Sequence, residues 1–371
     1  MEETRKIMAE LLFANYAPQN LEPVNSIGAK WPRLLDALDL SAAVRGRRVC
    51  VKMHLGGGTG FTTIHPYLTR QLIAKVKEAD AKSVFVTDSP EAVLSAAARG
   101  YTAETLGCPM VSVSGLSGRY YRTRPVEPPF NSFMEVDIGG EVADAEVLID
   151  FAHVKGHGAC GFGGAVKNLA MGCMTQKTRK EIHALEGGLE WDAVRCTRCK
   201  VCEQNCPNKA ISFSEEGRFE VFYHNCKFCQ HCVLICPAKA LKMLGGRYRD
   251  FQRGMALAAK AVLDCFPPER RLFVNVLTNV TIFCDCWGMT TPNLVPDIGI
   301  LAGRDIVAIE QATLDLIRFE DLIPGSLPSG WKIGRHGHLF ERLHGKDPYV
   351  VVECLAQLGL GAREYQLREI G

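Results

Sequence analysis

The sequence has little net charge, no long hydrophobic run and no sign of an export signal. Lysine and arginine number 43 against 41 acidic residues, a formal net charge of +2, so the chain has no general attraction to nucleic acid or to an anionic membrane. No stretch approaches the roughly 18 consecutive apolar residues of a bilayer-spanning helix. The first residues, MEETRKIMAELLFANY, contain acidic side chains and no cleavable apolar core. We therefore expect a cytoplasmic protein that binds neither nucleic acid nor membrane.

Cysteine is the residue type in excess, because the chain has 16. Disulfides do not persist in a reducing cytosol, so metal binding has to be considered. Two runs share the pattern C-x2-C-x2-C-x3-C-P, 30 residues apart, and are followed by the similar segments PNKAI and PAKAL. This spacing indicates an internal repeat, each unit a thiolate loop followed by a short helix. The first run is Cys196, Cys199, Cys202 and Cys206, and the second is Cys226, Cys229, Cys232 and Cys236.

The spacing of the two runs is typical of [4Fe–4S] clusters. Two-residue gaps let three sulfurs of one loop converge, and the cysteine before proline ligates the cluster of the other repeat. Zinc sites also use C-x2-C pairs, but they need neither a third cysteine nor a Cys-Pro in each run. Residues 191–245 resemble a bacterial two-cluster ferredoxin module. We assign one cluster to Cys196, Cys199, Cys202 and Cys236 and the other to Cys226, Cys229, Cys232 and Cys206.

Strand-like and helix-like segments alternate on both sides of this module. Such alternation predicts an α/β domain layered on a mostly parallel sheet, interrupted by a small α+β ferredoxin-like module. We predict 1–190 and 246–371 as its two parts and 191–245 as the insertion; independent N- and C-terminal domains are the alternative. The predicted strands are 47–55, 83–88, 110–114, 146–154, 271–279 and 362–369, and the predicted helices are 66–79, 91–100, 254–266, 305–317 and 347–361.

The densest group of polar residues outside the clusters follows the strand predicted at 146–154. If that strand continues, His153, Lys155 and His157 project from one face at its carboxyl end, where open α/β sheets bind ligands. A glycine-rich turn follows, and a helix is predicted to begin at about Ala165. Lysine charge and the amino terminus of that helix favour a small anionic substrate or cofactor; a tight turn with a solvated lysine face is the alternative. We predict Lys155, His157 and Lys167 as catalytic residues and Gly163, Gly164 and Asn168 as substrate-binding residues.

Two further segments are candidate sites. Cys284 and Cys286 flank Asp285, and two thiols at this spacing in an extended segment cannot form an unstrained disulfide. We therefore expect this segment to bind an additional metal or to line a pocket; two small buried residues near a loop are the alternative. The other segment is HLGGGTGFTTIH (54–65), whose glycines lead into a helix predicted from Pro66. A phosphate or carboxylate could rest on that helix start.

The segments HVKGHGACGFGGAVKN, CDC and VPDIGILAGRDIVAIEQATLDLI resemble the family catalogued as domain of unknown function 362, over most of the chain. Members of that family frequently carry a two-cluster ferredoxin module. GFGGAVK at 161–167 is also similar to a stretch of lactate racemase-type proteins, whose lysine holds a nickel-pincer nucleotide. Gly163 and Val166 depart from that stretch, so this weaker likeness implies kinship of fold rather than the cofactor. The family resemblance implies a Lys-x-His segment, a Lys-Asn pair and an Asp-Cys pair, here Lys155 and His157, Lys167 and Asn168, and Asp285 and Cys286.

Three functions are compatible with these residues. In the first, the protein is an iron–sulfur oxidoreductase, in which electrons pass through two [4Fe–4S] clusters to a substrate or cofactor bound in the α/β domain. In the second, it is a non-catalytic electron carrier whose α/β part recognises a redox partner protein. In the third, the clusters are structural and the lysines and histidines catalyse a redox-neutral, isomerase-like reaction. A carrier needs no second pocket, so residues 153–168 favour the enzyme.

Overall fold

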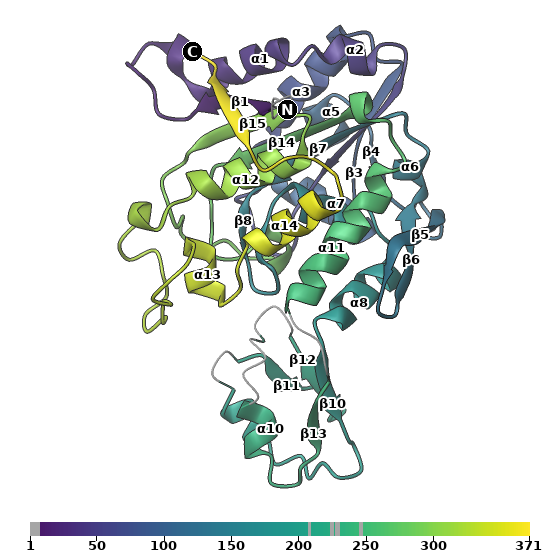
Figure 1. The fold of residues 1–371 in the computed structure, drawn as a ribbon, viewed down its shortest axis with the longest axis vertical. Coiled ribbons are helices and arrows are strands. Elements are labelled where there is room, and N and C mark those ends of the chain that lie inside the picture. Colours follow the sequence, from purple (N-terminus) through teal and green to yellow (C-terminus); the bar gives the residue numbers. More distant parts are fainter. Residues whose placement is uncertain (1–7, 207–208, 223–225, 227–230, 245–247) are drawn as a thin grey trace, which may run out of the picture.

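An eight-stranded sheet forms the centre of the α/β part (Figure 1). The computed structural model describes residues 8–206, 209–222, 226, 231–244 and 248–371. The strand order is β16-β1-β15-β14-β7-β2-β3-β4. Every neighbouring pair is parallel except those of β15, which runs antiparallel to β1 and β14. This arrangement confirms the mostly parallel α/β sheet. The strands are β1 (Ala9–Asn15), β2 (Arg48–Met53), β3 (Ser83–Asp88), β4 (Met110–Ser112), β7 (Val147–His153), β14 (Arg271–Leu277), β15 (Gly299–Gly303) and β16 (Tyr365–Glu369).

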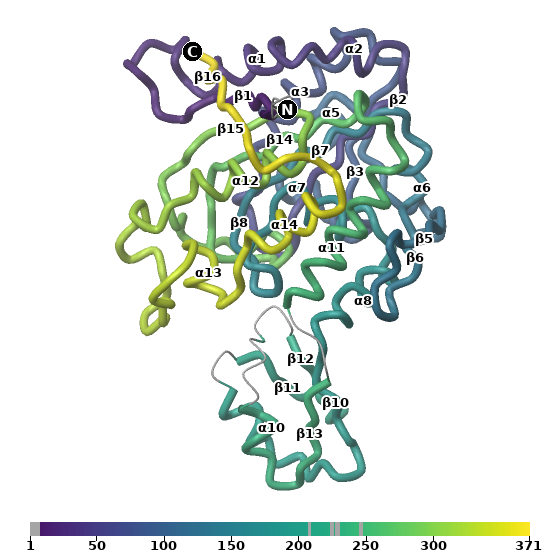
Figure 2. The backbone as a smooth tube through the Cα atoms, viewed as in Figure 1, coloured from purple at the N-terminus to yellow at the C-terminus, as the bar shows by residue number. Residues whose placement is uncertain are grey.

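The sheet takes strands from both sides of the cysteine-rich segment. β2, β3, β4 and β7 precede it in the sequence, whereas β14, β15 and β16 follow it. β16 pairs in parallel with β1, so strands from the two ends of the chain lie side by side at one edge (Figure 2). All six predicted strands belong to this one sheet, and β1 and β15 are strands that the sequence pattern missed.

Separate hydrophobic cores cover the two faces of the sheet. Along β7, Val147 and Ile149 belong to one core and Leu148 and Ala152 to the other, as the alternation of side chains in a strand requires. Helices α1 (Ile27–Ala37) and α3 (Pro66–Glu78) contribute to the first core. Among the helices that contribute to the second core are α7 (Ala165–Gly172), α11 (Tyr248–Leu263), α12 (Ile306–Leu316) and α14 (Tyr349–Gln357).

Four of the five predicted helices form as continuous α-helices. The exception is 91–100, which divides into α4 (Pro90–Ser95) and a 3₁₀ turn over Ala96–Arg99. The helix predicted at 254–266 is α11, which begins earlier, at Tyr248. Within the part of the chain that the structure describes, no helix combines the length and hydrophobicity that crossing a membrane would require.

The cysteine-rich module projects from the end of the α/β part where α8 (Gln176–Leu185) and α11 lie (Figure 1). Two small antiparallel sheets build it, β10 (Gly188–Trp191) with β13 (Leu241–Leu244) and β11 (Ile211–Phe213) with β12 (Phe219–Val221). Helices α9 (Val201–Gln204) and α10 (His231–Ile235) accompany them. The boundaries of the inserted module at 191 and 245 stay a prediction.

Candidate functional site

A pocket lies at the edge of the sheet where β2, β3 and β7 end. These strands run in the same direction, so their carboxyl ends meet at one edge. The pocket encloses about 590 Å³ of empty space, including the part open to solvent, which suits a small ligand. Four groups of residues line it: the polar ends of these strands, the turn and helix α7, Arg179 of α8, and the loop 284–286.

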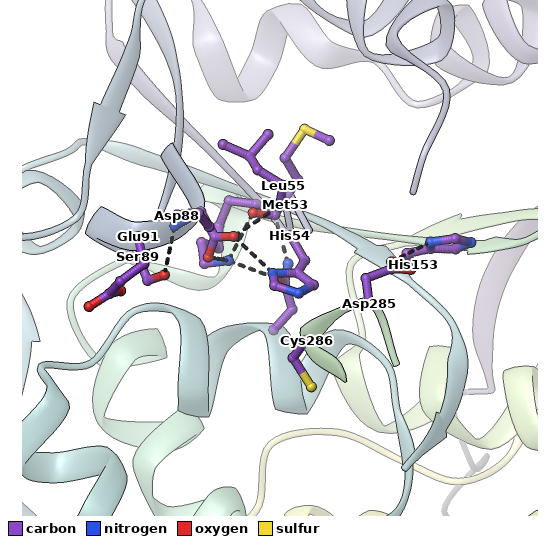
Figure 3. A network of polar contacts seen from close by, with 12 residues as sticks. Met53, His54, Leu55, Asp88, Ser89, Glu91, His153, Asp285 and Cys286 are labelled. Atoms are coloured by element: carbon purple, nitrogen blue, oxygen red, sulfur yellow. Dashed lines mark hydrogen bonds and ion pairs between the residues drawn. The ribbon is translucent and has the colours of Figure 1, made fainter. Parts of the chain in front are cut away.

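Lys52 and Asp88 form a buried ion pair on one wall of the pocket. The Lys52 ammonium donates to Asp88 Oδ1 at 2.9 Å, to Asn168 Oδ1 at 2.8 Å and to a backbone oxygen at 3.0 Å. Its three donors are therefore satisfied. Asp88 Oδ2 accepts from a backbone N–H and lies 2.9 Å from His54 Nδ1 (Figure 3). Burial alone would raise the pKa of Asp88, but Lys52 and His54 outweigh it and hold that pKa below its ordinary value.

His54 is oriented by Asp88 in a way that suits proton transfer. Asp88 holds Nδ1, whereas Nε2 is a buried atom to which no residue that the structure describes hydrogen bonds. The side chain is 28% exposed and lines the pocket. A histidine held through one nitrogen by a carboxylate can present the other to a ligand as an acid or a base.

Asp285 ties the loop 284–286 to the end of β7. Its Oδ2 lies 2.8 Å from His153 Nδ1, and its Oδ1 lies 2.6 Å from Lys155 Nζ (Figure 3 shows the His153 side). Burial alone would raise the pKa of Asp285, but His153 and Lys155 hold it below its ordinary value. Burial lowers the pKa of Lys155 despite Asp285. Lys155 also donates to both oxygens of Thr62 at 2.9 Å. Predicted as catalytic, Lys155 is instead buried beneath the pocket wall, bound to Asp285 and Thr62.

The strand that we expected to run through residues 153–157 is interrupted. β7 ends at His153, and β8 (Lys155–His157) pairs antiparallel with β9 (Gly161–Gly163) in a separate hairpin. The Gly156 N–H donates to Thr281 O at 2.9 Å, and this contact holds the hairpin against the chain leading to Asp285. His153 and Lys155 still converge on one carboxylate, whereas His157 lies in the hairpin with Nδ1 3.2 Å from Cys160 Sγ.

Helix α7 begins at Ala165, as predicted, and carries Lys167 into the pocket. The Lys167 ammonium is half-buried and lies 3.5 Å from Cys284 Sγ and 3.7 Å from Cys286 Sγ. Burial lowers the pKa of Lys167. Two of the three candidate sites of the sequence, 153–168 and 284–286, are thus walls of one pocket.

The amino terminus of α7 is occupied by a side chain of the protein itself. Glu310 Oε1 accepts from the Val166 N–H at 3.4 Å, and burial raises the pKa of Glu310 to about 7. Gly164 makes room for this carboxyl group, since a Cβ there would lie 2.5 Å from Oε1. The structure thus places a carboxyl group of the protein where we expected the substrate anion, and Gly163 and Gly164, predicted to bind substrate, line the pocket.

Asn168 lines the pocket, but its polar atoms are engaged inside the protein. Its oxygen accepts from Lys52, and its nitrogen donates to Asp150 Oδ1 at 2.6 Å and to Lys52 O at 2.9 Å. Burial raises the pKa of Asp150 well above its ordinary value. Asn168, predicted to bind substrate, therefore positions Lys52 in this structure.

Cys284 and Cys286 are joined by a disulfide bond, contrary to our expectation. That expectation assumed an extended segment. Cys284 instead caps a 3₁₀ turn over Asp285–Trp287, which brings the two Cα atoms to 5.3 Å, and its sulfur accepts the Cys286 N–H at 3.3 Å. One nitrogen of His157 and the two sulfurs lie within 4.8 Å of one another, a spacing that could hold a metal ion if the sulfurs were thiolates.

The segment 54–65 packs against the chain that follows the disulfide. The Thr59 N–H donates to Gly288 O at 2.8 Å. Gly58, at φ +50°, permits this approach because a Cβ there would lie 2.5 Å from the same oxygen. Helix α3 starts at Pro66 as predicted, but the His65 ring already accepts the N–H of Tyr67 at 3.1 Å. The expected anion site at this helix start is therefore capped by the chain itself.

The cysteines assigned to the first cluster line one small cavity in the module. It has about 340 Å³ of empty space, and its other walls include Trp191, Phe213 and Phe219. Four sulfurs around one cavity with apolar walls are the ligands and setting that a [4Fe–4S] cluster requires, so these residues fit the cluster. The cysteines on the cavity are Cys196, Cys199, Cys202 and Cys236.

The second half of the module repeats the local geometry of the first. Cys206 Sγ accepts the Ala210 N–H at 3.2 Å, and Cys236 Sγ accepts the Ala240 N–H at 3.3 Å. N–H···S bonds of this kind stabilise a thiolate. Of the cysteines assigned to the second cluster, Cys229 lies outside the described residues. Cys206, Cys226 and Cys232 are all partly exposed.

The module touches the pocket loop through aromatic rings. Phe222, which follows β12, packs edge-on against Trp287 with ring centroids 4.6 Å apart. Trp287 in turn stacks on Phe283 at 4.0 Å. A buried lysine makes a second link, since Lys346 Nζ lies 3.3 Å from Cys226 O and also donates to Gly158 O.

The sequence reasoning missed Lys52, Asp88 and Arg179 of the pocket, and it reached His54 only as the first residue of the segment 54–65. Asp88 ends a predicted strand and His54 lies near the end of another, which is the position that singled out residues 153–157. Lys52 is a charged residue inside the apolar run RRVCVKMHL, and such a residue needs a buried partner.

Comparisons with known proteins found a family that matches most of the chain and relatives that match a short segment of it. A sequence model of the family described as Domain of unknown function (DUF362) matches residues 49–315. The pyruvate synthase subunit PorD of Methanocaldococcus jannaschii is 38% identical over 50 residues, 14% of this chain and 58% of that protein. A ferredoxin of Pyrobaculum islandicum is 35% identical over 46 residues, 12% of this chain and 43% of that protein. The chain thus spans about half the length of these relatives, and a short segment of it resembles ferredoxin-type proteins.

Among solved structures, the lactate racemase apoprotein of Thermoanaerobacterium thermosaccharolyticum is similar, with a TM-score of 0.35 and 13% sequence identity. The similarity covers 68% of this chain and 49% of that one.

Proposed function

Since the chain belongs to the family described as Domain of unknown function (DUF362), we propose its activity from its own residues. The protein is an iron–sulfur oxidoreductase of the cytoplasm that holds two [4Fe–4S] clusters and acts on a small anionic substrate in the α/β pocket. When bound, such clusters supply one-electron transfer. A redox partner protein delivers or removes the electrons.

The contact between the module and the pocket loop is the observation that carries this proposal. Trp287 directly follows Cys286 on the pocket wall and packs against Phe222 of the module at 4.6 Å. Lys346 adds a bond to the backbone of Cys226, a proposed cluster ligand, at 3.3 Å. An electron carrier needs no such pocket, and clusters with a purely structural role need no contact with its wall.

Charge on the pocket wall supports an anionic substrate. The charges of Lys52 and Asp88 cancel, and those of Asp285 and Lys155 cancel beneath the wall. Lys167 adds positive charge that these pairs do not balance, and Arg179 adds a second positive charge, which faces the exposed carboxylate of Glu91 at 3.9 Å. Because the start of α7 is occupied by a carboxyl group of the protein, the anion binds to these two basic side chains.

His54 supplies or accepts the proton of the reaction. Asp88 fixes its Nδ1, and Nε2, which is buried and has no hydrogen-bond partner among the described residues, is the nitrogen left for a ligand. His153 cannot take this part, since Asp285 and the backbone of Thr278 hold both of its nitrogens at 2.8 and 2.7 Å. Lys167 binds the anion, whereas Lys155 positions the loop through Asp285.

The cluster assignment is tested on anaerobically purified protein. We expect about eight irons per chain, four for each cluster. Because the ligands cross, Cys206→Ala and Cys226→Ala should lose the same cluster and give the same residual electron paramagnetic resonance spectrum. Cys236→Ala is the matched control and should match Cys196→Ala instead. Two zinc ions and no iron per chain would refute the clusters. If the spectrum of Cys206→Ala matched that of Cys196→Ala, and that of Cys236→Ala matched that of Cys226→Ala, the exchange of ligands between the two repeats would be refuted.

The oxidoreductase assignment is tested by oxidation of reduced methyl viologen with a panel of small carboxylate and phosphate acceptors. We expect His54→Gln and Lys167→Ala to keep full iron content and lose at least tenfold in turnover with the acceptor found. The protein could instead convert the same compounds without oxidising viologen. If the Cys196→Ala variant kept that activity, the redox-neutral enzyme would be established. That alternative draws on the acid–base pair of His54 and Asp88.

A further inference from the structure

The disulfide between Cys284 and Cys286 lies where the pocket meets the module. Cys284 is 7% exposed, whereas Cys286 is exposed on the pocket wall. Thiol–disulfide exchange requires that at least one sulfur be open to attack. This pair therefore has one accessible sulfur and one that is shielded by the protein.

Lys167 gives the two sulfurs a setting that favours their reduced form. Its ammonium lies 3.5 Å from Cys284 Sγ and 3.7 Å from Cys286 Sγ. A cation at this distance stabilises a thiolate, whereas a disulfide has no charge for it to stabilise. Lys167 therefore makes the pair easier to reduce, as a stabilised reduced form does in strongly oxidising disulfides.

The aromatic contact connects this disulfide with the module. Trp287 is the next residue after Cys286, and its ring lies between Phe283 at 4.0 Å and Phe222 of the module at 4.6 Å. The Cys226 N–H donates to Phe222 O at 3.3 Å. A proposed cluster ligand is thus one hydrogen bond from the aromatic residue that touches the disulfide loop.

We propose that Cys284 and Cys286 are a redox-active disulfide/dithiol pair, which takes electrons from the iron–sulfur module. This inference rests on the proposed function for its electron donor. Reduction breaks the bond between the two sulfurs and takes up two electrons and two protons, leaving two thiols. The electrons come from an iron–sulfur donor in two single transfers, and the protons come from water. An organic disulfide reoxidises the pair by exchange. The Cys286 thiolate attacks it, forms a mixed disulfide and releases one thiol. Cys284 then attacks the Cys286 sulfur of the mixed disulfide, which re-forms the Cys284–Cys286 bond and releases the second thiol.

The potential of the pair is measured on the full chain in redox buffers, glutathione for the oxidising range and dithiothreitol for the reducing range, and in each the ratio of reduced to oxidised form is varied in steps. After an acid quench and alkylation, mass spectrometry reads the peptide that contains both cysteines. We expect both to become alkylated together in one reversible two-electron transition. Lys167→Met should lower the equilibrium constant for reduction about tenfold, which is about 30 mV for a two-electron couple. Lys180→Met, which changes an exposed lysine of α8, is the matched control and should leave the transition unchanged.

Three results would overturn the proposal. The two cysteines could be thiols across the whole range of buffers, or they could be alkylated independently of each other. The third result is a bound zinc ion, one per chain, that protects both cysteines from alkylation. That result would assign His157 and the two sulfurs to a metal site.

A second measurement separates this inference from the proposed function. Protein with the disulfide intact is reduced anaerobically by a photochemical one-electron donor, and alkylation of the peptide is followed over time. We expect thiols to appear in the native protein and to appear at least tenfold more slowly in Cys226→Ala and Trp287→Leu. Clusters that are loaded and reduced beside an unchanged disulfide would refute the inference and leave the proposed function standing. Failure to load iron would refute the proposed function, while the redox-buffer titration would still report on the pair.

Discussion

Asp285 is the residue whose removal should most disturb the pocket. It is buried and faces the Lys155 ammonium at 2.6 Å and His153 at 2.8 Å. Lys155 is itself buried, so Asp285→Ala leaves an ammonium without its counter-charge in a site that water does not reach. Its bonds to Thr62 remain, but they supply no negative charge.

The loss of stability expected for Asp285→Ala follows from the difference between buried and exposed ion pairs. Removing one partner of a buried pair destabilises a protein by about 3–5 kcal/mol, because the other charge stays buried. The exposed pair of Lys177 and Glu135, at 3.1 Å with both side chains 55% exposed, is the internal comparison. Glu135→Ala should cost no more than about 1 kcal/mol. Asp285→Asn should fall between these values, because it keeps the volume and one acceptor but removes the charge.

Thermal unfolding of the iron-loaded protein, followed by circular dichroism, measures the difference. We expect Asp285→Ala to lower Tm by several degrees and Glu135→Ala to leave it nearly unchanged. Adding Lys155→Met to Asp285→Ala should recover part of the loss, because the unpaired charge is then gone; contacting groups typically couple by about 0.5–3 kcal/mol. A double variant whose loss equals the sum of the two single losses would refute the pairing.

Three further predictions concern the surroundings of the pocket. Burial raises the pKa of Glu310 to about 7, so the folded state holds a proton that the unfolded state releases at lower pH. Stability should therefore fall as pH rises from about 4.5 to 7 and level off above, by at most about 3 kcal/mol for this group. A pH series of urea unfolding curves should show a smaller fall in Glu310→Gln, in which Asp150, whose pKa burial also raises, still contributes. Gly172→Ala would place a Cβ 2.3 Å from Lys52 Cε, so we expect the free energy of unfolding to fall by about 1–3 kcal/mol in the same assay. The control is Gly107→Ala, at a turn where a Cβ would have nothing within 4 Å. It should show only the smaller cost of its backbone conformation. Trp191 and Leu241 are paired in β10 and β13, so replacing 192–240 by Asn-Gly should close a hairpin and leave a folded α/β domain; loss of the cooperative melt would show that this domain depends on the module.

The sequence determined those features that depend on local spacing. Cysteine spacing indicated a segment that resembles ferredoxin-type proteins, because the cysteines of such proteins lie at fixed spacings in short loops. Strand and helix periodicity indicated the mostly parallel sheet because buried strands are apolar runs of limited length. The position of polar residues after a strand pointed to His153 and to the pocket edge, since parallel strands end at the same edge. The same rule, applied to the ends of β2 and β3, would have added His54 and Asp88.

Only the tertiary structure decided how these segments meet. Lys167 and Cys284 are 117 residues apart in the sequence, yet their side chains are 3.5 Å apart, because α7 and the loop after β14 meet at one edge of the sheet. Local spacing carries no information on such a contact. The disulfide depends on a 3₁₀ turn capped by Cys284, which an assumed extended segment concealed. The start of α7 was expected to bind substrate, but Glu310 reaches it from α12, and no pattern within residues 153–173 encodes a side chain that arrives from a distant helix.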